Sequence, residues 1–271
     1  MKYLTFLFAL GLCFIFVSAL KSPNVLTKED TSISEVLSKL GEPLPKHARP
    51  NASEEQIDQG RDLIFKGRTI DSDGKKSKYI SKFYTCASCH SPIKEDPNVG
   101  LFDAQARLDY AAENNLKFLQ GSTFYGIANR ESWYNDDYDK KYGDLVKPAR
   151  NSLAESTQLC AKVCSSGRYL EDWELEAILA YFWNNQLKIK DLNISEKEML
   201  TIQDTKNKQE AIDLLKSKYA RKSPATFGDS PKRQDLGFEG IAGDPVNGKK
   251  IYELSCMSCH QDGGVSGVAF T

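Results

Sequence analysis

Apolar residues along most of this chain recur at the three- and four-residue spacing of amphipathic helices. After Ser53, a favourable N-cap residue, an apolar stripe runs through residues 54–66 and ends at Gly67, a residue that commonly stops helices. Residues 171–183 have the same period, with Ala177 on the apolar face. The pattern predicts a mainly α fold.

The first residues have a different pattern. Lys2 is followed by an almost unbroken apolar run, Leu4–Val17, and then by small residues ending at Ala19. This arrangement predicts a secretory signal peptide, residues 1–19, cleaved after Ala19. An uncleaved membrane anchor is the alternative, because the run barely reaches the roughly 17 to 20 residues that span a bilayer. Cys13 is then an ordinary apolar member of the signal.

Three further segments show less apolar periodicity. Residues 20–53 are rich in Pro, Ser, Thr and Lys, with three prolines between 43 and 50, and are predicted to be an extended leader. Residues 71–78 are predicted to be a polar loop. Residues 191–239 are predicted to be a charged helical connector followed by a flexible linker rich in Pro, Gly and charge.

Composition excludes one broad class of function. The chain has 36 Lys and Arg against 37 Asp and Glu, and removal of the signal would remove only Lys2. Such a balance is not the basic footprint of a nucleic-acid-binding protein. The length after cleavage allows one to two domains.

Two copies of one five-residue pattern, in which two cysteines are followed by a histidine, carry the most specific chemistry. The copies are Cys86, Cys89 and His90, and then Cys256, Cys259 and His260. This spacing is the attachment signature of c-type haem, because two thiols three residues apart can reach two vinyl groups on one porphyrin edge. The histidine then binds the iron as the proximal ligand. We expect two covalently bound haems, and therefore one-electron chemistry.

Other readings of the pattern are less favourable. Structural zinc sites usually bring two cysteine pairs within about 15 to 20 residues of each other, whereas 166 residues separate Cys89 from Cys256. A thioredoxin-like redox pair would need a strand, a turn and a helix, and the flanks are polar turns and helical stretches.

With these motifs and helices in place, residues 54–190 resemble a class I cytochrome c domain, with the helix at 171–183 as its closing helix. The resemblance makes the interior of this domain unusually long. The excess contains an aromatic stretch, residues 123–142, which either walls the haem edge or a substrate channel, or is a packed excursion on the surface.

Residues 243–252 resemble the opening helix of a second such domain, residues 240–271. Only eleven residues follow His260, whereas the family needs many more to supply a distal ligand and a closing helix. We therefore expect that the second domain is truncated here; a genuine minimal haem site is the alternative.

The resemblance implies a distal methionine shortly before the closing helix, but none occurs between His90 and Trp183. Cys164 stands where it would be, with Cys160 one turn earlier, so either is a candidate thiolate ligand that would lower the potential. The alternative is a disulfide between the two, which fits an oxidising compartment and predicts a broken helix there.

Two other residues were weighed as distal ligands. His47, outside both motifs, either folds back as a distal imidazole or is simply solvated. Met199, on the predicted connector helix, is expected to pack in a core and remains a weak candidate for either iron. Met257 lies between the two thiols of its own motif and cannot reach the far face.

As a whole the chain resembles the exported diheme c-type cytochromes of bacteria. The resemblance implies a periplasmic electron carrier that exchanges electrons with redox partner proteins, with membrane association only if the signal is retained. A second hypothesis, from similarity to thiosulfate dehydrogenases, is a haem oxidoreductase acting on a small sulfur anion, with Arg150 and Arg168 attracting the anion. A third is a haem-bearing subunit that docks a larger enzyme through its aromatic segment.

Overall fold

We describe a computed structural model of the chain, which covers residues 28–204, 206–224 and 227–260. Over these residues the fold is mainly helical, and the only β pairing is isolated bridges without strands. None of the helices in this range is long and apolar enough to cross a membrane. The predicted signal peptide and the residues after His260 lie outside the described residues.

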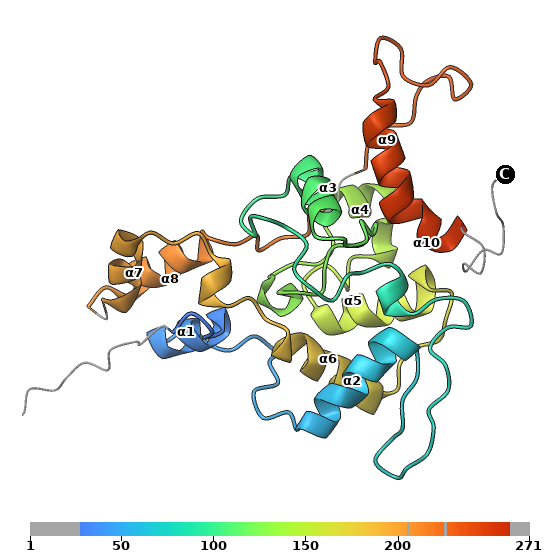
Figure 1. The fold of residues 1–271 in the computed structure, drawn as a ribbon. Helices are drawn as coiled ribbons and strands as arrows, with labels where there is room; N and C mark the ends of the chain where they lie inside the picture. The colour runs from blue at the N-terminus through green and yellow to red at the C-terminus, as the bar shows by residue number, and fades with distance from the viewer. Residues whose placement is uncertain (1–27, 205, 225–226, 261–271) are drawn as a thin grey trace, which may run out of the picture.

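The described residues form ten α-helices, two π-helical turns and four short 3-10 turns. Figure 1 shows how the helices are arranged. The α-helices are α1 Ile33–Leu40, α2 Glu54–Lys66, α3 Ala104–Glu113, α4 Asp136–Tyr142, α5 Leu153–Leu159, α6 Asp172–Asn184, α7 Glu196–Gln203, α8 Lys208–Lys216, α9 Pro245–Ile251 and α10 Met257–His260. The π turns are Cys160–Cys164 and Tyr252–Cys256, and the 3-10 turns are Cys86–Ser88, Ile127–Asn129, Gly143–Leu145 and Ile189–Asp191.

The first predicted helix is confirmed as α2. The hydroxyl of Ser53 accepts a hydrogen bond from the backbone N–H of Gln56 at 3.1 Å, which satisfies one of the free N–H groups at the helix start. Gly67 ends the helix in the left-handed conformation, with φ of 71°, where a side chain would be strained. The second predicted helix is confirmed as α6, which begins in a capping box at Glu171.

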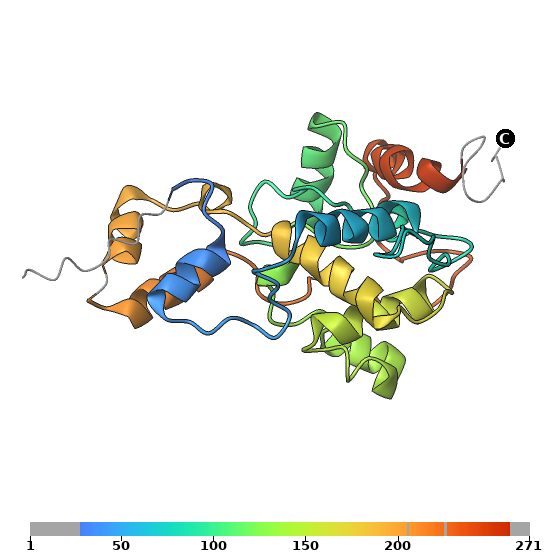
Figure 2. The same cartoon turned by 90° about the horizontal axis from the view of Figure 1, so that it is seen from below.

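Helices α2 and α6 cross and pack against each other, as both ribbon views show (Figures 1 and 2). The crossing is close because Gly60 has no side chain. A Cβ atom placed on Gly60 would lie 2.0 Å from the carbonyl oxygen of Ala177. Neither backbone could accommodate that atom, so Gly60 fixes how near the two helices approach.

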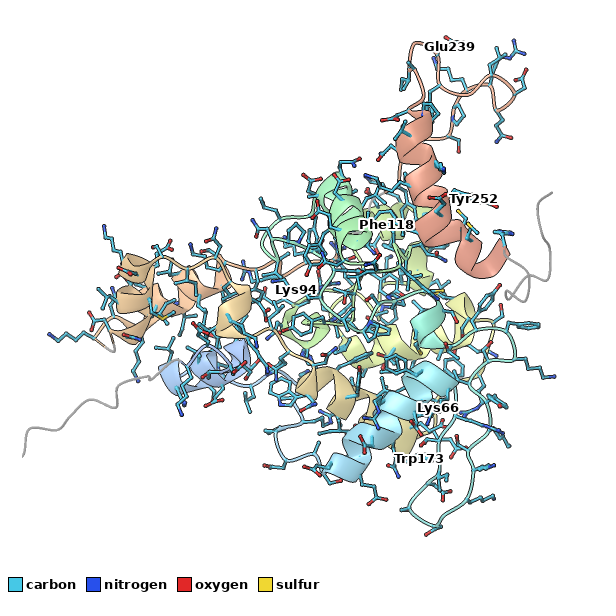
Figure 3. All side chains as sticks on the ribbon, viewed as in Figure 1. Lys66, Lys94, Phe118, Trp173, Glu239 and Tyr252 are labelled. Atoms are coloured by element: carbon cyan, nitrogen blue, oxygen red, sulfur yellow. The ribbon has the colours of Figure 1, made fainter. Side chains whose placement is uncertain are left out.

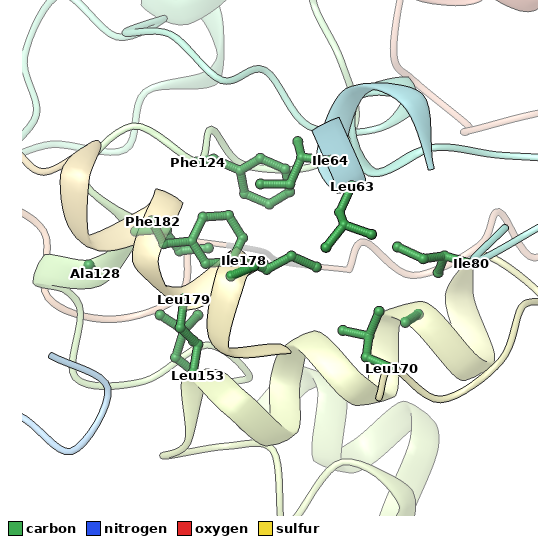
Figure 4. Close-up of a cluster of buried hydrophobic side chains, with 13 residues drawn as sticks. Leu63, Ile64, Ile80, Phe124, Ala128, Leu153, Leu170, Ile178, Leu179 and Phe182 are labelled. Atoms are coloured by element: carbon green, nitrogen blue, oxygen red, sulfur yellow. The ribbon is translucent and has the colours of Figure 1, made fainter. Parts of the chain in front are cut away.

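The main core lies beneath this crossing (Figure 4). Its side chains come from α2, α5, α6 and the loops between them, so residues more than 100 positions apart share one core. The buried members are Leu63, Ile64, Ile80, Phe124, Ile127, Ala128, Leu153, Ala161, Leu170, Ala177, Ile178, Leu179 and Phe182. This core supports one wall of the cavity described below.

The prediction of an extended leader is wrong for residues 33–40, which form α1. Ser32 caps this helix through the N–H of Glu35, and Gly41 ends it with φ of 103°. The apolar face of α1, which includes Ile33, Val36 and Leu40, packs with α7 and α8 in a second core. The neighbouring prolines follow the helix and do not interrupt it.

The predicted connector is confirmed as helical, since it contains α7 and α8, but it is more than a spacer. These two helices and α1 form a packed unit beside the main core (Figures 1 and 2). Met199 packs against this unit, as the sequence predicted. The helix expected at residues 243–252 is confirmed by α9, which begins after Asp244, with Pro245 in its first turn.

Candidate functional site

A cavity of about 820 Å³ lies against the main core and next to the first cysteine–histidine motif. We call it the central cavity. Its lining includes residues from α2, α5, α6, the π turn 160–164 and the loops at 84–107 and 120–138. Among them are Cys86, Cys89, His90, Glu95, Asp96, Arg107, Arg130, Trp133, Tyr134, Tyr138, Cys160 and Cys164. The fold thus gathers five of the site residues expected from the sequence, Cys86, Cys89, His90, Cys160 and Cys164, around one space.

Both cysteines of the first motif line this cavity. The tight 3-10 turn Cys86–Ser88 places them, and the N–H of His90 donates to the carbonyl of Cys86 at 3.1 Å. Thr85 caps the turn through a reciprocal bond with Ser88. Burial raises the pKa of the Cys86 thiol to about 11, so this thiol is protonated at neutral pH in the folded chain.

The ring of His90 is held in one orientation. Its Nδ1 lies 2.8 Å from the carbonyl oxygen of Ser122, and the ring stacks on Phe124 with centroids 4.6 Å apart. Because a carbonyl can only accept, Nδ1 carries the proton and Nε2 is the nitrogen available to bind a metal. Burial lowers the pKa of His90 and so favours the neutral form that metal binding requires.

Gly121 allows this arrangement. A Cβ atom at this position would lie 2.5 Å from Nδ1 and Cε1 of His90 and 2.6 Å from the carbonyl of Cys89. The N–H of Gly121 donates to that same carbonyl at 2.8 Å. The segment around residue 121 therefore packs against the His90 ring and holds the backbone of Cys89 in place.

Cys160 and Cys164 line the same cavity on the π turn that follows α5. Both are free thiols, so the disulfide alternative is not the state of this structure, although the predicted break in regular helix is there as the π turn. Hydrogen bonds from Cys160 and from the Tyr134 hydroxyl lower the pKa of Cys164 to about 6. The negative charge of the pair therefore belongs on Cys164, and the pKa of Cys160 is raised.

A buried group of charges forms another part of the wall, and the sequence reasoning missed it. Glu95 is 1% exposed and lies 2.9 Å from the Arg107 guanidinium. Arg130 donates to the Ser122 hydroxyl at 2.8 Å. Burial raises the pKa of Glu95 to about 7 and lowers that of Arg130 to about 10. These residues are brought together only by the fold, so no local spacing in the sequence predicts the group.

The aromatic stretch at 123–142 contributes Phe124, Trp133, Tyr134 and Tyr138 to the cavity lining. Tyr134 and Tyr138 contact each other edge to face, with centroids 4.8 Å apart, and Tyr138 also contacts Phe227 at 4.8 Å. Of the two hypotheses for this stretch, the geometry therefore favours a wall of the cavity.

His47 and Met199 do not line the cavity. His47 donates through Nε2 to the carbonyl of Ala128 at 2.8 Å and contacts Trp133 edge to face. The ring is not part of the cavity lining, so the structure does not bring His47 to the site where a distal ligand would stand. Met199 packs in the second core.

The two arginines expected to attract an anion are also occupied elsewhere. Arg150 pairs with Asp136 and Asp139, and Arg168 makes a two-pronged pair with buried Glu174, with both bonds at 2.6 Å. Neither residue lines the central cavity. The cavity's guanidinium groups are instead Arg107 and Arg130.

The second motif has different surroundings. It follows α9 through the π turn Tyr252–Cys256, and Cys256 is an exposed free thiol. Neither Cys256 nor His260 lines the central cavity. The structure therefore does not bring the two motifs around one cofactor.

The first site fits a haem group in the terms that the residues present allow. Its volume lies within the range of about 300 to 1,000 Å³ usual for cofactor pockets, and two thiols, a histidine with Nε2 available and a thiolate candidate share its wall. In the described ranges, no three His, Cys, Asp or Glu side chains are close enough to hold a bare metal ion.

Comparison with known proteins adds no further constraint: no family, no curated protein and no solved structure matches this chain.

Proposed function

We propose that this chain is a c-type cytochrome that carries out one-electron transfer through two covalently bound haems. The observation that carries the proposal is the arrangement of Cys86, Cys89 and His90 on the wall of one large cavity. The Ser122 carbonyl fixes the histidine in the tautomer that a metal needs. In this proposal residues 54–190 form an expanded cytochrome c-like domain, and the second motif opens another.

Different residues around the cavity would hold different parts of the cofactor. Cys86 and Cys89 would form the thioether links, and His90 would be the proximal ligand. Cys164 is the favoured distal ligand, because it is the cavity thiol with the lowered pKa and a metal binds the thiolate form. Arg107 and Arg130 are the cations available to face the carboxylates of the porphyrin.

When bound, haem supplies an iron that cycles between ferrous and ferric states. The Ser122 carbonyl makes His90 more basic, and a Cys164 thiolate would lower the reduction potential relative to methionine. The apolar side of the cavity, from Leu63 to Phe182, would exclude water from the ring. Buried charges and limited access of water to the iron both influence the reduction potential of a haem site.

The same proposal includes the compartment and the partners. The amino-terminal pattern supports export to the periplasm. Export fits covalent haem attachment, which bacteria carry out on the outer side of the inner membrane. The partners are other redox proteins, and the near-neutral charge of the chain supports no role with nucleic acid. Membrane association would require that the amino-terminal run is retained.

A second candidate function is oxidation of a small sulfur anion at a cysteine-ligated haem. One observation favours it: Cys164 is exposed at its edge of the cavity and has a lowered pKa, so it could meet a substrate. The expected arginine pair gives no support, since both members are engaged away from the cavity. Thiosulfate turnover lost in Cys164→Ala would favour this function, and electron exchange without turnover would favour the carrier.

The proposal is tested by expressing the chain with a periplasmic haem-attachment system and measuring its intact mass and visible spectrum. We expect the mass of two haems and a c-type spectrum. Cys86→Ala with Cys89→Ala should remove one haem, and Cys256→Ala with Cys259→Ala the other. Cys160→Ala is the matched control, because it removes a cavity thiol outside both motifs. A bare polypeptide mass from a correctly exported protein would overturn the proposal.

A further inference from the structure

The helix that leads into the second motif packs on the surface of the first domain. Lys250 on α9 forms an ion pair with Asp109 on α3 at 2.6 Å. Beside it, the side-chain amides of Gln105 and Asn247 bond to each other in both directions, at 3.2 and 2.8 Å. Both ribbon views show α9 next to α3 (Figures 1 and 2). The two faces are therefore complementary in charge and in hydrogen bonding.

A backbone bond extends this contact to the edge of the motif itself. The N–H of Phe118 donates to the carbonyl of Leu254 at 3.0 Å, two residues before Cys256. Leu254 lies in the π turn Tyr252–Cys256, where the altered hydrogen-bond spacing departs from regular helix. Figure 3 draws the side chains of this region and labels Phe118 and Tyr252, the residue that begins the π turn.

The same short segment contacts the first motif. Three residues after Phe118, the N–H of Gly121 donates to the carbonyl of Cys89 at 2.8 Å, and the side-chain amide of Gln120 lies 3.8 Å from the Cys89 sulfur. The Arg107 guanidinium lies over the Phe118 ring, 4.7 Å from its centroid, and so contacts the same segment. Residues 118–121, which we call the bridge, thus contact Cys89 of the first motif and Leu254 of the π turn that ends at Cys256.

We propose that α3 and the bridge form the docking surface for the second haem module of this same chain, and that this surface holds the two haems close enough for direct electron exchange. This inference rests on the proposed function. The occupant is the chain's own second motif because α9 presents Lys250 and Asn247 to Asp109 and Gln105. Electron transfer weakens steeply with distance, so a bridge bonded to Cys89 and to the turn that ends at Cys256 favours electron transfer within the chain.

The test compares charge variants of the full-length, haem-loaded protein. Asp109→Lys replaces the attraction to Lys250 with a repulsion, and we expect the docking equilibrium constant to fall severalfold. Asp109→Lys with Gln105→Ala removes both side-chain contacts and should undock the module further. Exchanging the charges, Asp109→Lys with Lys250→Asp, should restore docking.

Lys249→Asp is the matched control, because Lys249 precedes Lys250 on the same helix but is 75% exposed and pairs with Glu253 at 3.7 Å. The readouts are magnetic coupling between the ferric haems and the rate at which an electron equilibrates between them after partial photoreduction. We expect both to fall in the undocked variants and to be unchanged in the control.

The outcomes separate the two proposals. A protein without haem mass overturns the proposed function and this inference with it. Two attached haems that show no coupling in the unmodified chain, or coupling that survives Asp109→Lys with Gln105→Ala, overturn the docking surface alone. Loss in that variant, with recovery in the charge exchange, supports it.

Discussion

The two cysteine–histidine motifs are nearly the same in sequence, and their surroundings are very different. Cys86 and His90 line a cavity of about 820 Å³ whose wall includes residues as distant in the chain as Pro224, whereas Cys256 is exposed on the π turn after α9, the helix that packs on α3. The pattern therefore specifies which atoms can be attached. The chemistry of each site depends on what distant parts of the chain bring to it.

The largest difference between the two regions should be their dependence on the α2–α6 crossing. Gly60→Ala forces a Cβ atom against the Ala177 carbonyl, and we expect it to destabilise the protein by about 3 kcal/mol. Denaturant unfolding followed by circular dichroism measures the loss. With the proposed haems attached, the spectrum of the first haem, at Cys86 and Cys89, should change before that of the second. Unchanged stability would show that the crossing does not support the first site.

Cys164→Ala should alter the first haem and leave the second unchanged. Loss of a thiolate ligand should raise the potential of the first haem by on the order of 0.1 V and change its low-spin ferric spectrum. Redox titration with electron paramagnetic resonance measures both effects. A spectrum identical to that of the unmodified protein would eliminate Cys164 as the ligand.

Tyr134→Phe tests the same ligand in a second way, because the Tyr134 hydroxyl donates a hydrogen bond to the Cys164 sulfur. Without this hydrogen bond the sulfur should donate more charge, so the potential of the first haem should fall by a smaller amount than Cys164→Ala raises it. Tyr138→Phe is the control, since Tyr138 lines the same cavity. Equal shifts in the two variants would contradict a specific role for Tyr134.

Glu95→Gln should change how the stability of the first site varies with pH. The pKa of Glu95 is raised from 4.5 to about 7 in the folded chain, so the unfolded chain loses this proton first. The free energy of unfolding therefore falls as pH rises from about 4.5 to 7, by about 3 kcal/mol in total. In unfolding measurements at pH 5 and pH 8, the variant should not show this fall. An equal fall in the variant and the unmodified protein would refute the prediction.

The smallest effect should be at the second site. Gly248 lies within α9, and a Cβ atom there would meet nothing within 4 Å. Gly248→Ala should therefore stabilise the helix by about 0.5 to 1 kcal/mol. A small rise in the denaturation midpoint with unchanged haem spectra checks this. A loss of stability would mean that α9 packs more tightly than the structure indicates.

Sequence reasoning succeeded where the signals are local. Ser53 and Gly67 mark both ends of α2, and the position of Cys164 relative to the closing helix pointed to the cavity that it lines. The error at α1 was avoidable, since Ser32 and Gly41 are the same kind of markers, and the prolines that follow outweighed them in the prediction.

Other features depended on the fold and had no local signal. Glu95 and Arg130 are 35 positions apart and meet only because the intervening loop returns to the same wall. The sequence leaves two alternatives for His47, and its contact with the Ala128 carbonyl, 81 positions away, has no local signal. Buried polar groups need partners, but which partner is near is decided by tertiary packing.

The state of Cys86 has a consequence for how the protein is made. In the folded chain burial holds this thiol in its protonated form, with a pKa of about 11, whereas thiols react as thiolates. For the linkage proposed here, attachment is therefore favoured on a chain that has not yet closed around residue 86. Biogenesis would then have a fixed order, with cofactor ligation first and final folding afterwards.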